Sequence, residues 1–276
     1  MKMVQPYEIH KFKTDEVSLV NDLVVVEEPL EIKILFNEAP FEVALNVTMR
    51  TPGNDQELAI GFLLNEQLIQ SVNEIEKMTY CAETDELNTL KIWLNDASWF
   101  LSHYQPKKFV TSSACGVCGK TSIEELNNKN CAVISQKVTL SAYTIQSFQK
   151  VMDDSQLAFS ITGGIHAVGL FDLSGEMIAV KEDVGRHNAM DKIVGWAHQN
   201  QVSLKDKVAV FSGRISFELV QKAVVQQIPV IVAFGAPSSL AIDLCKAFNI
   251  TVCGFAKNGR FNVYNGIENI ELNQSK

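Results

Sequence analysis

The sequence feature that most constrains the fold is a regular alternation of apolar runs in the second half of the chain. From residue 207 onward, short runs of strand length alternate with longer runs of helical length, with turn residues between them. Strands joined by helices of this length form crossover connections, which place neighbouring strands parallel and cover the sheet. The pattern predicts an α/β domain with strands at 207–211, 229–234 and 250–255 and helices at 217–226 and 240–248.

The first half of the chain has a different rhythm and predicts a smaller α+β region. Two alternating runs, 23–36 and 41–50, are separated by a turn and predict a hairpin. Asn54, followed by Glu57 three residues later, resembles a capping box and predicts the start of a helix. We expect an N-terminal region at residues 1–105 and the α/β domain at 106–276. Further predicted elements are strands at 75–81 and 87–94, a hairpin of 167–172 and 177–181, and a helix at 188–199.

The charge and the N-terminal sequence narrow the possible partners. The chain of 276 residues has a net charge of −8 and no run of basic residues, which argues against a nucleic-acid surface. It shows neither a signal peptide nor an apolar stretch long enough to span a membrane, so we expect a cytoplasmic protein. Six cysteines are too few for a disulfide scaffold. Four of them lie in or beside apolar sequence and are predicted to be small buried side chains: Cys81, Cys131, Cys245 and Cys253.

The other two cysteines, Cys115 and Cys118, form a Cys-x-x-Cys pair that could take part in a reaction. Ser122 followed by Glu125 resembles a capping box, so a helix is predicted to begin just after the pair. The positive end of that helix and the adjacent Lys120 would both stabilise a thiolate, which is the nucleophilic form of cysteine. Glycines beside the thiols would keep the loop uncrowded. The pattern indicates sulfur or redox chemistry.

Several other interpretations of the pair remain open. A structural zinc site needs four ligands, and His103 and Cys131 could complete one only with unusual spacing. A thioredoxin-like motif would follow the first strand of a βαβ unit, whereas this pair lies in the middle of the chain. A P-loop would need a glycine where Ala114 stands. A purely structural pair of cysteines is also possible, but the segment is too polar to belong to a hydrophobic core.

Polar loops follow three of the predicted strands, at 212–214, 235–239 and 257–260. The carboxyl ends of parallel strands form the ligand crevice of open α/β sheets. Arg214, Lys257 and Arg260 supply cations there, and Ser238 or Ser239 can cap the next helix, whose N–H groups suit a phosphate. Each loop alone is typical of an ordinary turn. Three at one edge favour an anionic ligand such as a nucleotide.

Two further polar loops, 162–166 and 183–188, carry His166 and His187. A histidine in such a loop can serve a functional role or simply satisfy backbone partners. The sequence alone favours neither for these two side chains.

Taken together, these residues resemble the FdhD family, the formate dehydrogenase accessory sulfurtransferases. The resemblance covers most of the chain and is dense from residue 109 onward. It is much more specific than the Cys-x-x-Cys pair alone. The matching segments are 112–122, 162–166, 182–192, 212–218, 236–241 and 254–264.

The resemblance implies a fold, a chemistry and a set of partners. The fold is a cytidine-deaminase-like α/β fold with a mixed or parallel sheet, usually dimeric and without a zinc of its own. Family members accept persulfide sulfur from a cysteine desulfurase and pass it to the bis-molybdopterin guanine dinucleotide cofactor of molybdenum or tungsten. That cofactor is a bound substrate, and it then enters formate dehydrogenase.

The resemblance also assigns roles to residues. Cys115 matches the cysteine that carries the persulfide, and Cys118 is its partner thiol. Two alternatives remain: a chaperone that binds the same cofactor without transferring sulfur, and a zinc-stabilised interaction module. The stretch that matches the family's cofactor-binding segment is Phe255, Ala256, Lys257, Asn258, Gly259 and Arg260.

Overall fold

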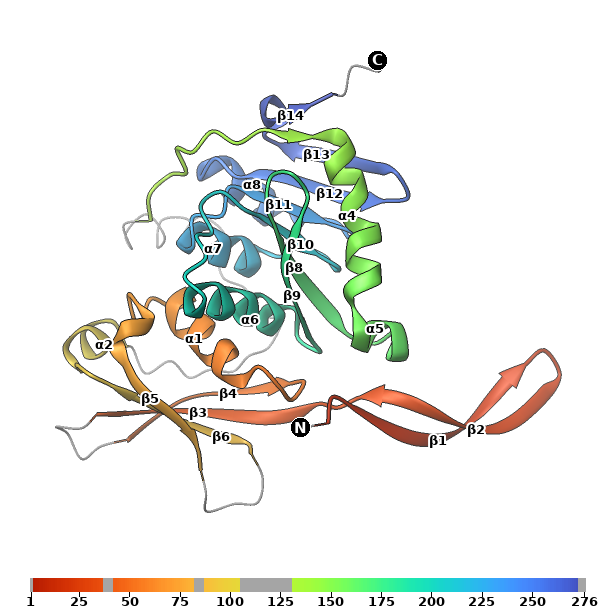
Figure 1. The fold of residues 1–276 in the computed structure, drawn as a ribbon, viewed down its shortest axis with the longest axis horizontal. Coiled ribbons are helices and arrows are strands. Elements are labelled where there is room, and N and C mark those ends of the chain that lie inside the picture. The colour runs from red at the N-terminus through yellow and green to blue at the C-terminus, as the bar shows by residue number, and fades with distance from the viewer. Residues whose placement is uncertain (1, 37–41, 82–86, 105–130, 273–276) are drawn as a thin grey trace.

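The second half of the chain forms a six-stranded mixed sheet in the order β13-β12-β11-β10-β8-β9 (Figure 1). The computed structural model describes residues 2–36, 42–81, 87–104 and 131–272. Strands β10, β11 and β12 are parallel, whereas β8, β9 and β13 pair antiparallel, so the predicted parallel arrangement holds for three strands. The strands are β8 (His166–Phe171), β9 (Met177–Asp183), β10 (Val208–Phe211), β11 (Val230–Ala233), β12 (Thr251–Lys257) and β13 (Arg260–Asn265).

Helices cover both faces of this sheet, as the continuous apolar strands require. Alternate residues of each strand point to opposite faces, so Val208 and Val230 pack with Phe148 on one side. Phe211 packs with Leu219 on the other. The first face is covered by α4 (Ala142–Ser155), which leads into the short α5 (Leu157–Thr162), and the second by α6 (Arg186–Gln199), α7 (Phe217–Val225) and α8 (Ser239–Ala247).

The first half of the chain adds a four-stranded sheet in the order β4-β3-β6-β5. The predicted hairpin is confirmed, because β3 and β4 pair antiparallel; β3 also pairs parallel with β6. A separate two-stranded hairpin, β1–β2, precedes this sheet and was not predicted. Two short strands also pair, β7 (Leu140–Ser141) and β14 (Ile270–Glu271). The N-terminal elements are β1 (Val4–Lys13), β2 (Glu16–Val25), β3 (Glu28–Phe36), β4 (Glu42–Arg50), α1 (Asp55–Asn65), β5 (Ile75–Tyr80), β6 (Thr89–Leu94) and α2 (Ser98–His103).

Two glycines let α1 and α6 approach until their backbones touch. A Cβ atom on Gly61 would collide with the backbone of Asp191, and one on Gly195 would collide with the backbone of Glu57. Helix α1 therefore lies between the four-stranded sheet and α6, and its apolar residues belong to the same core as those of α6 (Figure 1). The predicted boundary at residue 105 stays a prediction.

The predicted capping box at the start of α1 is wrong. Asn54 precedes the helix, but its backbone is left-handed, with φ of 59°, and its side chain makes no capping hydrogen bond. The start of the helix is instead fixed by Asp55, whose carboxylate receives two hydrogen bonds from the buried guanidinium of Arg50, at 3.1 and 3.0 Å. A bidentate pair of this kind is stronger than a neutral cap, because both partners are charged.

The four cysteines outside the Cys-x-x-Cys pair differ in burial. Cys245 and Cys253 are fully buried, as predicted, and burial raises the pKa of each thiol to about 12. Both are therefore protonated at neutral pH and poor nucleophiles. Cys81 and Cys131 are only partly buried, so the prediction is wrong for these two. Within the described ranges, no helix has the length and apolar character needed to cross a membrane.

Candidate functional site

Backbone hydrogen bonds join the loops that follow β10, β11 and β12 into one edge. Gly235 N–H donates to the carbonyl of Gly213 at 3.1 Å, and Phe255 N–H donates to the carbonyl of Gly235 at 3.0 Å. A Cβ atom on Gly235 would lie 2.9 Å from the backbone of Gly213, so the close approach requires glycine here. The structure thus brings together the three loops that the sequence singled out.

The predicted cation and cap residues occupy different positions within this edge. Arg214 is exposed in the first loop. In the second, the Ser238 hydroxyl accepts a hydrogen bond from Ala241 N–H at 3.3 Å and caps α8, as predicted. Ser239 is the first residue of that helix and is exposed. The hydroxyl of Ser238 is thus engaged in the cap, while Arg214 and Ser239 face solvent.

The segment matched to cofactor binding forms the end of β12 and the turn into β13. Asn258 and Gly259 make the turn with left-handed backbones, and Lys257 pairs with Arg260 across it. Two glutamines of α4 hold the turn: the Gln149 side chain accepts from Asn258 N–H, and the Gln146 side chain donates to the Gly259 carbonyl, both at 2.8 Å.

The side chains of this segment differ in exposure. Phe255 has φ of 54°, which is strained for an aromatic residue, and 40% of its surface is exposed. Lys257 and Arg260 are exposed as well. Ala256 is instead buried. An exposed aromatic residue and two exposed cations in one short segment suit a ligand that combines a flat ring with phosphates.

An open cleft of about 790 Å³ continues from this turn along the edge of the sheet. Gln149 both lines the cleft and holds the turn, so the two features are contiguous. Gln156 also lines the cleft; its side chain is buried, yet its Oε1 atom has no hydrogen-bond partner among the described residues. A buried acceptor without a partner is costly unless a ligand or water supplies the donor. The remaining walls come from Asp153 of α4, the α5 segment, the 163–166 loop, Val184 and the ends of β10 and β11.

The sequence did not single out Arg186, whose charge acts both on His166, which lines the cleft, and on His187. Arg186 is the first residue of α6, and no side chain caps that helix. Its Nε atom is buried and has no hydrogen-bond partner in the described part of the chain. His187 follows directly, with its Nε2 atom 3.2 Å from the Ser216 hydroxyl and 3.9 Å from the Glu218 carboxylate. The signal that could have found Arg186 is a basic residue at a helix start without a capping side chain before it.

The two histidines are neutral at pH 7. Burial lowers the pKa of His166, and the charges of Arg186 and Arg214 lower it further. Burial also lowers the pKa of His187 to about 4, with Lys222 and Arg186 acting in the same direction. The positive field around both rings is what an anion would encounter at this edge.

Comparison with known proteins shows the family of this chain. The sequence profile of the FdhD/NarQ family matches residues 25–271. The chain belongs to the FdhD/NarQ family. It is 42% identical to a sulfur carrier protein FdhD from Nocardia farcinica, over 89% of this chain and 87% of that one. A protein of the same name from Picrophilus torridus is 38% identical, over 91% and 93% of the two chains.

A solved structure supports the fold. A protein from Desulfotalea psychrophila, assigned as a formate dehydrogenase accessory protein, superposes with a TM-score of 0.74 and 21% identity, covering 98% of this chain and all of that one. This likeness shows the fold of an FdhD/NarQ protein. The comparison with cytidine deaminases stays a prediction.

The two thiols of this FdhD/NarQ chain lie outside the described residues. Cys115 and Cys118 belong to the segment 105–130, so their predicted roles stay predictions. The described residues on either side of the segment make defined contacts with the rest of the protein. Tyr104 stacks on Phe100 with ring centroids 5.1 Å apart, and the Gln67 amide donates to the Cys131 sulfur at 3.9 Å.

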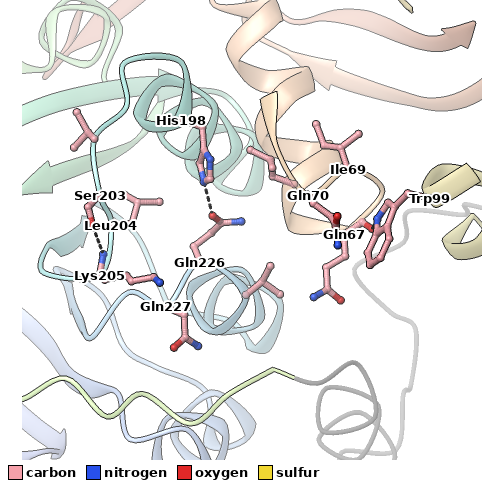
Figure 2. Close-up of a pocket in the computed structure, with 13 residues that line it drawn as sticks. Gln67, Ile69, Gln70, Trp99, His198, Ser203, Leu204, Lys205, Gln226 and Gln227 are labelled. Carbon is pink, nitrogen blue, oxygen red and sulfur yellow. Dashed lines mark hydrogen bonds between the residues drawn. The ribbon is translucent and has the colours of Figure 1, made fainter. Parts of the chain in front are cut away.

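A second pocket of about 470 Å³ lies beside these flanks, at the opposite ends of β10 and β11 (Figure 2). Trp99 donates to the Gln67 carbonyl at 3.1 Å on one side, and His198 bonds to Gln226 at 2.8 Å on another. Helices α1, α6 and α7 all end here, and helix C-termini repel anions. The cleft at the strand ends, and not this pocket, therefore suits an anionic ligand of an FdhD/NarQ protein.

Proposed function

We propose that this protein is a sulfurtransferase that carries sulfur as a persulfide on Cys115 and delivers it to a pterin dinucleotide cofactor. The observation that carries the proposal is the cationic strand-end edge with its adjoining cleft, in an FdhD/NarQ chain that also has a Cys-x-x-Cys pair. Its curated relatives are named sulfur carrier proteins. The two features supply the two things the reaction needs, a sulfur carrier and an acceptor site.

The proposed transfer has two steps. The Cys115 thiolate attacks the terminal sulfur of a persulfide on a cysteine desulfurase; a new S–S bond forms, and the desulfurase cysteine leaves as a thiolate. The Cys118 thiolate then attacks the inner sulfur of the Cys115 persulfide. This forms a disulfide and releases the terminal sulfur as hydrosulfide to the metal of the cofactor. A dithiol reductant restores both thiols.

The proposed acceptor is the bis-molybdopterin guanine dinucleotide cofactor, which is a substrate here. Its diphosphates need cations, which Arg214, Lys257, Arg260 and Arg186 supply along the edge. Its guanine carries N–H donors, and the unpartnered Oε1 atom of Gln156 is an acceptor at the cleft. In a chain of net charge −8, these few cations cannot be replaced by a general surface potential.

The proposal also includes partners and a compartment. Sulfur comes from a cysteine desulfurase, and the sulfurated cofactor goes to formate dehydrogenase, in the cytoplasm. We propose a homodimer. Two alternative functions can be distinguished from this one by experiment. A chaperone without sulfur transfer would carry no persulfide by mass spectrometry, and a zinc-stabilised module would contain one zinc per chain, lost on mutation of Cys115 or Cys118.

The ligand edge can be tested with GDP as a partial mimic of the cofactor. We expect Arg260→Ala to weaken GDP binding about tenfold or more, because a charge-assisted hydrogen bond contributes about 1.5–3 kcal/mol. ADP should bind less well than GDP if the protein forms hydrogen bonds with the edge of the guanine base. Isothermal titration calorimetry with both nucleotides measures these differences.

The matched control is Lys205→Ala. Lys205 is also an exposed cation, but it lines the second pocket at the other end of the sheet. It changes the net charge by the same amount and should leave GDP affinity unchanged. Equal GDP affinity in wild type and Arg260→Ala would remove Arg260 from the site.

A further inference from the structure

Helix α4 presents a polar stripe to the cleft that starts at the 258–259 turn. Gln149, Asp153 and Gln156 all line the cleft, and their spacing of four and three residues places them on one side of the helix and its C-terminal cap. Gln149 also accepts a hydrogen bond from the N–H of Asn258 in the turn. A rise of about 1.5 Å per residue puts Gln156 roughly 10 Å farther along the helix axis. The stripe therefore leads from the cations of the turn to the C-terminal end of α4.

The backbone around Gln156 is fixed from both directions. Its N–H donates to the carbonyl of Met152, and its carbonyl accepts from the N–H of Ser160, both at 3.0 Å. Glu182 holds the following helix, α5, because its two carboxylate oxygens accept from two N–H groups in the first turn, at 3.0 and 2.9 Å. Gln156 itself is only 2% exposed, and its Oε1 atom has no partner among the described residues. An acceptor held in this way is positioned to receive a hydrogen bond from a bound molecule.

Asp153 adds a carboxylate to the same end of the cleft. It is exposed and lies three residues before Gln156. A carboxylate repels phosphate, so this end does not suit the diphosphate, which Lys257 and Arg260 attract at the turn. An ionised carboxylate only accepts hydrogen bonds. The two oxygens of Asp153 and the Oε1 atom of Gln156 therefore offer acceptors for a ligand group that is uncharged and rich in N–H donors.

We propose that Asp153 and Gln156 bind the guanine base of the ligand and distinguish it from other purines. The edge of guanine carries N–H donors side by side, on N1 and on the 2-amino group. These donors match the acceptors of the two side chains. Adenine presents N1 as an acceptor at the same place, and an acceptor that faces a carboxylate is unfavourable. The pair therefore selects guanine both by attraction and by rejection of adenine.

The proposal sets the direction in which the ligand lies. The diphosphate is at the turn, the ribose lies along α4, and the base is at the C-terminal end of this helix. Phe159 and Phe234 line the cleft as well, and aromatic side chains stack on any purine, so they add affinity without selecting the base. The inference rests on the proposed function, because it concerns the guanine of the same cofactor.

Asp153→Asn tests the base contact by changing which base is preferred. Asparagine replaces one acceptor oxygen with an amide that donates, and xanthosine diphosphate has a 2-oxo group where GDP has the 2-amino group. We expect this variant to bind GDP about tenfold more weakly and xanthosine diphosphate about tenfold more tightly than wild type does. Isothermal titration calorimetry with GDP, xanthosine diphosphate and ADP measures these affinities. A gain in affinity for one nucleotide cannot result from misfolding.

Three further variants separate the base from the phosphates. Gln156→Leu removes the buried acceptor and should weaken GDP binding about tenfold, with ADP binding unchanged. Arg260→Ala should weaken the binding of all three nucleotides alike, because each carries the same diphosphate. Asp154→Asn is the matched control. Asp154 is the next carboxylate on α4; it is exposed but is not among the described residues that line the cleft, so this variant should keep the wild-type affinities.

The possible failures distinguish this inference from the function on which it rests. Equal GDP and ADP affinities in wild type, or wild-type affinities in Asp153→Asn, would overturn the base contact. Weaker binding by Arg260→Ala would in that case still support the ligand edge. If wild type bound none of the three nucleotides, both the base contact and the proposed ligand edge would be wrong.

Discussion

Replacing Cys115 by alanine is expected to abolish sulfur delivery while leaving the protein folded. The persulfide forms on this thiol in the proposed mechanism, and alanine offers no nucleophile to take its place. A thiol in a polar, glycine-containing segment contributes little apolar burial, so stability should change little. The measurement is activation of formate dehydrogenase in a reconstituted system with a cysteine desulfurase, together with thermal unfolding of the variant.

Two other cysteine variants serve as comparisons for Cys115→Ala. Cys118→Ala should impair turnover less completely, because an external thiol can release the terminal sulfur more slowly. Cys245→Ala removes a buried thiol whose pKa of about 12 makes it unreactive, so it should still deliver sulfur. Dehydrogenase activation by the Cys115 variant at the wild-type level would show that the sulfur travels on another group.

Replacing Lys192 by methionine is expected to destabilise the protein by about 3–5 kcal/mol. The ammonium group of Lys192 lies 2.7 Å from the Asp183 carboxylate, and both side chains are fully buried. It also donates to the Thr51 carbonyl at 3.0 Å, which ties the N-terminal region to the α/β part. Methionine preserves the volume but leaves a buried carboxylate without its counter-ion, and that is the origin of the large cost.

Lys207→Met is the matched control for this prediction. Lys207 pairs with Asp206 at 2.6 Å; its own side chain is 14% exposed, but Asp206 is 47% exposed, and a pair open to solvent on one side contributes about 0–1 kcal/mol. Urea unfolding of the two variants gives the comparison. If Lys192→Met were no less stable than Lys207→Met, the buried ammonium of Lys192, with its ion pair to Asp183 and its hydrogen bond to Thr51, would not contribute to stability as described.

The sequence predicted the central sheet well because burial on both faces leaves a strong pattern. The runs at 208–211 and 230–233 are apolar at every position, and only a covered strand tolerates this. The β1–β2 hairpin was missed for the opposite reason. Its strands alternate polar and apolar residues and are exposed almost throughout, so the pattern resembles an unstructured polar terminus. The capping box was predicted wrongly because the buried guanidinium of Arg50, the last residue of the predicted hairpin, fixes Asp55 at the start of the helix.

The candidate site was partly predictable. Glycines and cations after apolar strands indicated the three loops, since strand ends meet at one edge of a parallel sheet. The contribution of Arg186 and the partnerless oxygen of Gln156 were not predictable, because they depend on how α4 and α5 pack around the cleft and on how α6 places Arg186 near His166. The docking of the 258–259 turn on two glutamines of α4 is likewise a tertiary contact between residues over 100 positions apart.

Locating the transferred sulfur atom shows whether Cys115 carries it. Incubating the protein with a cysteine desulfurase and isotopically labelled cysteine, followed by alkylation, digestion and mass spectrometry, identifies the labelled residue. We expect one labelled sulfur atom on Cys115, none on Cys81, Cys131, Cys245 or Cys253, and no label in the Cys115→Ala variant. Label on any of those four cysteines, or persistent label in the Cys115→Ala variant, would show that Cys115 is not the sulfur carrier.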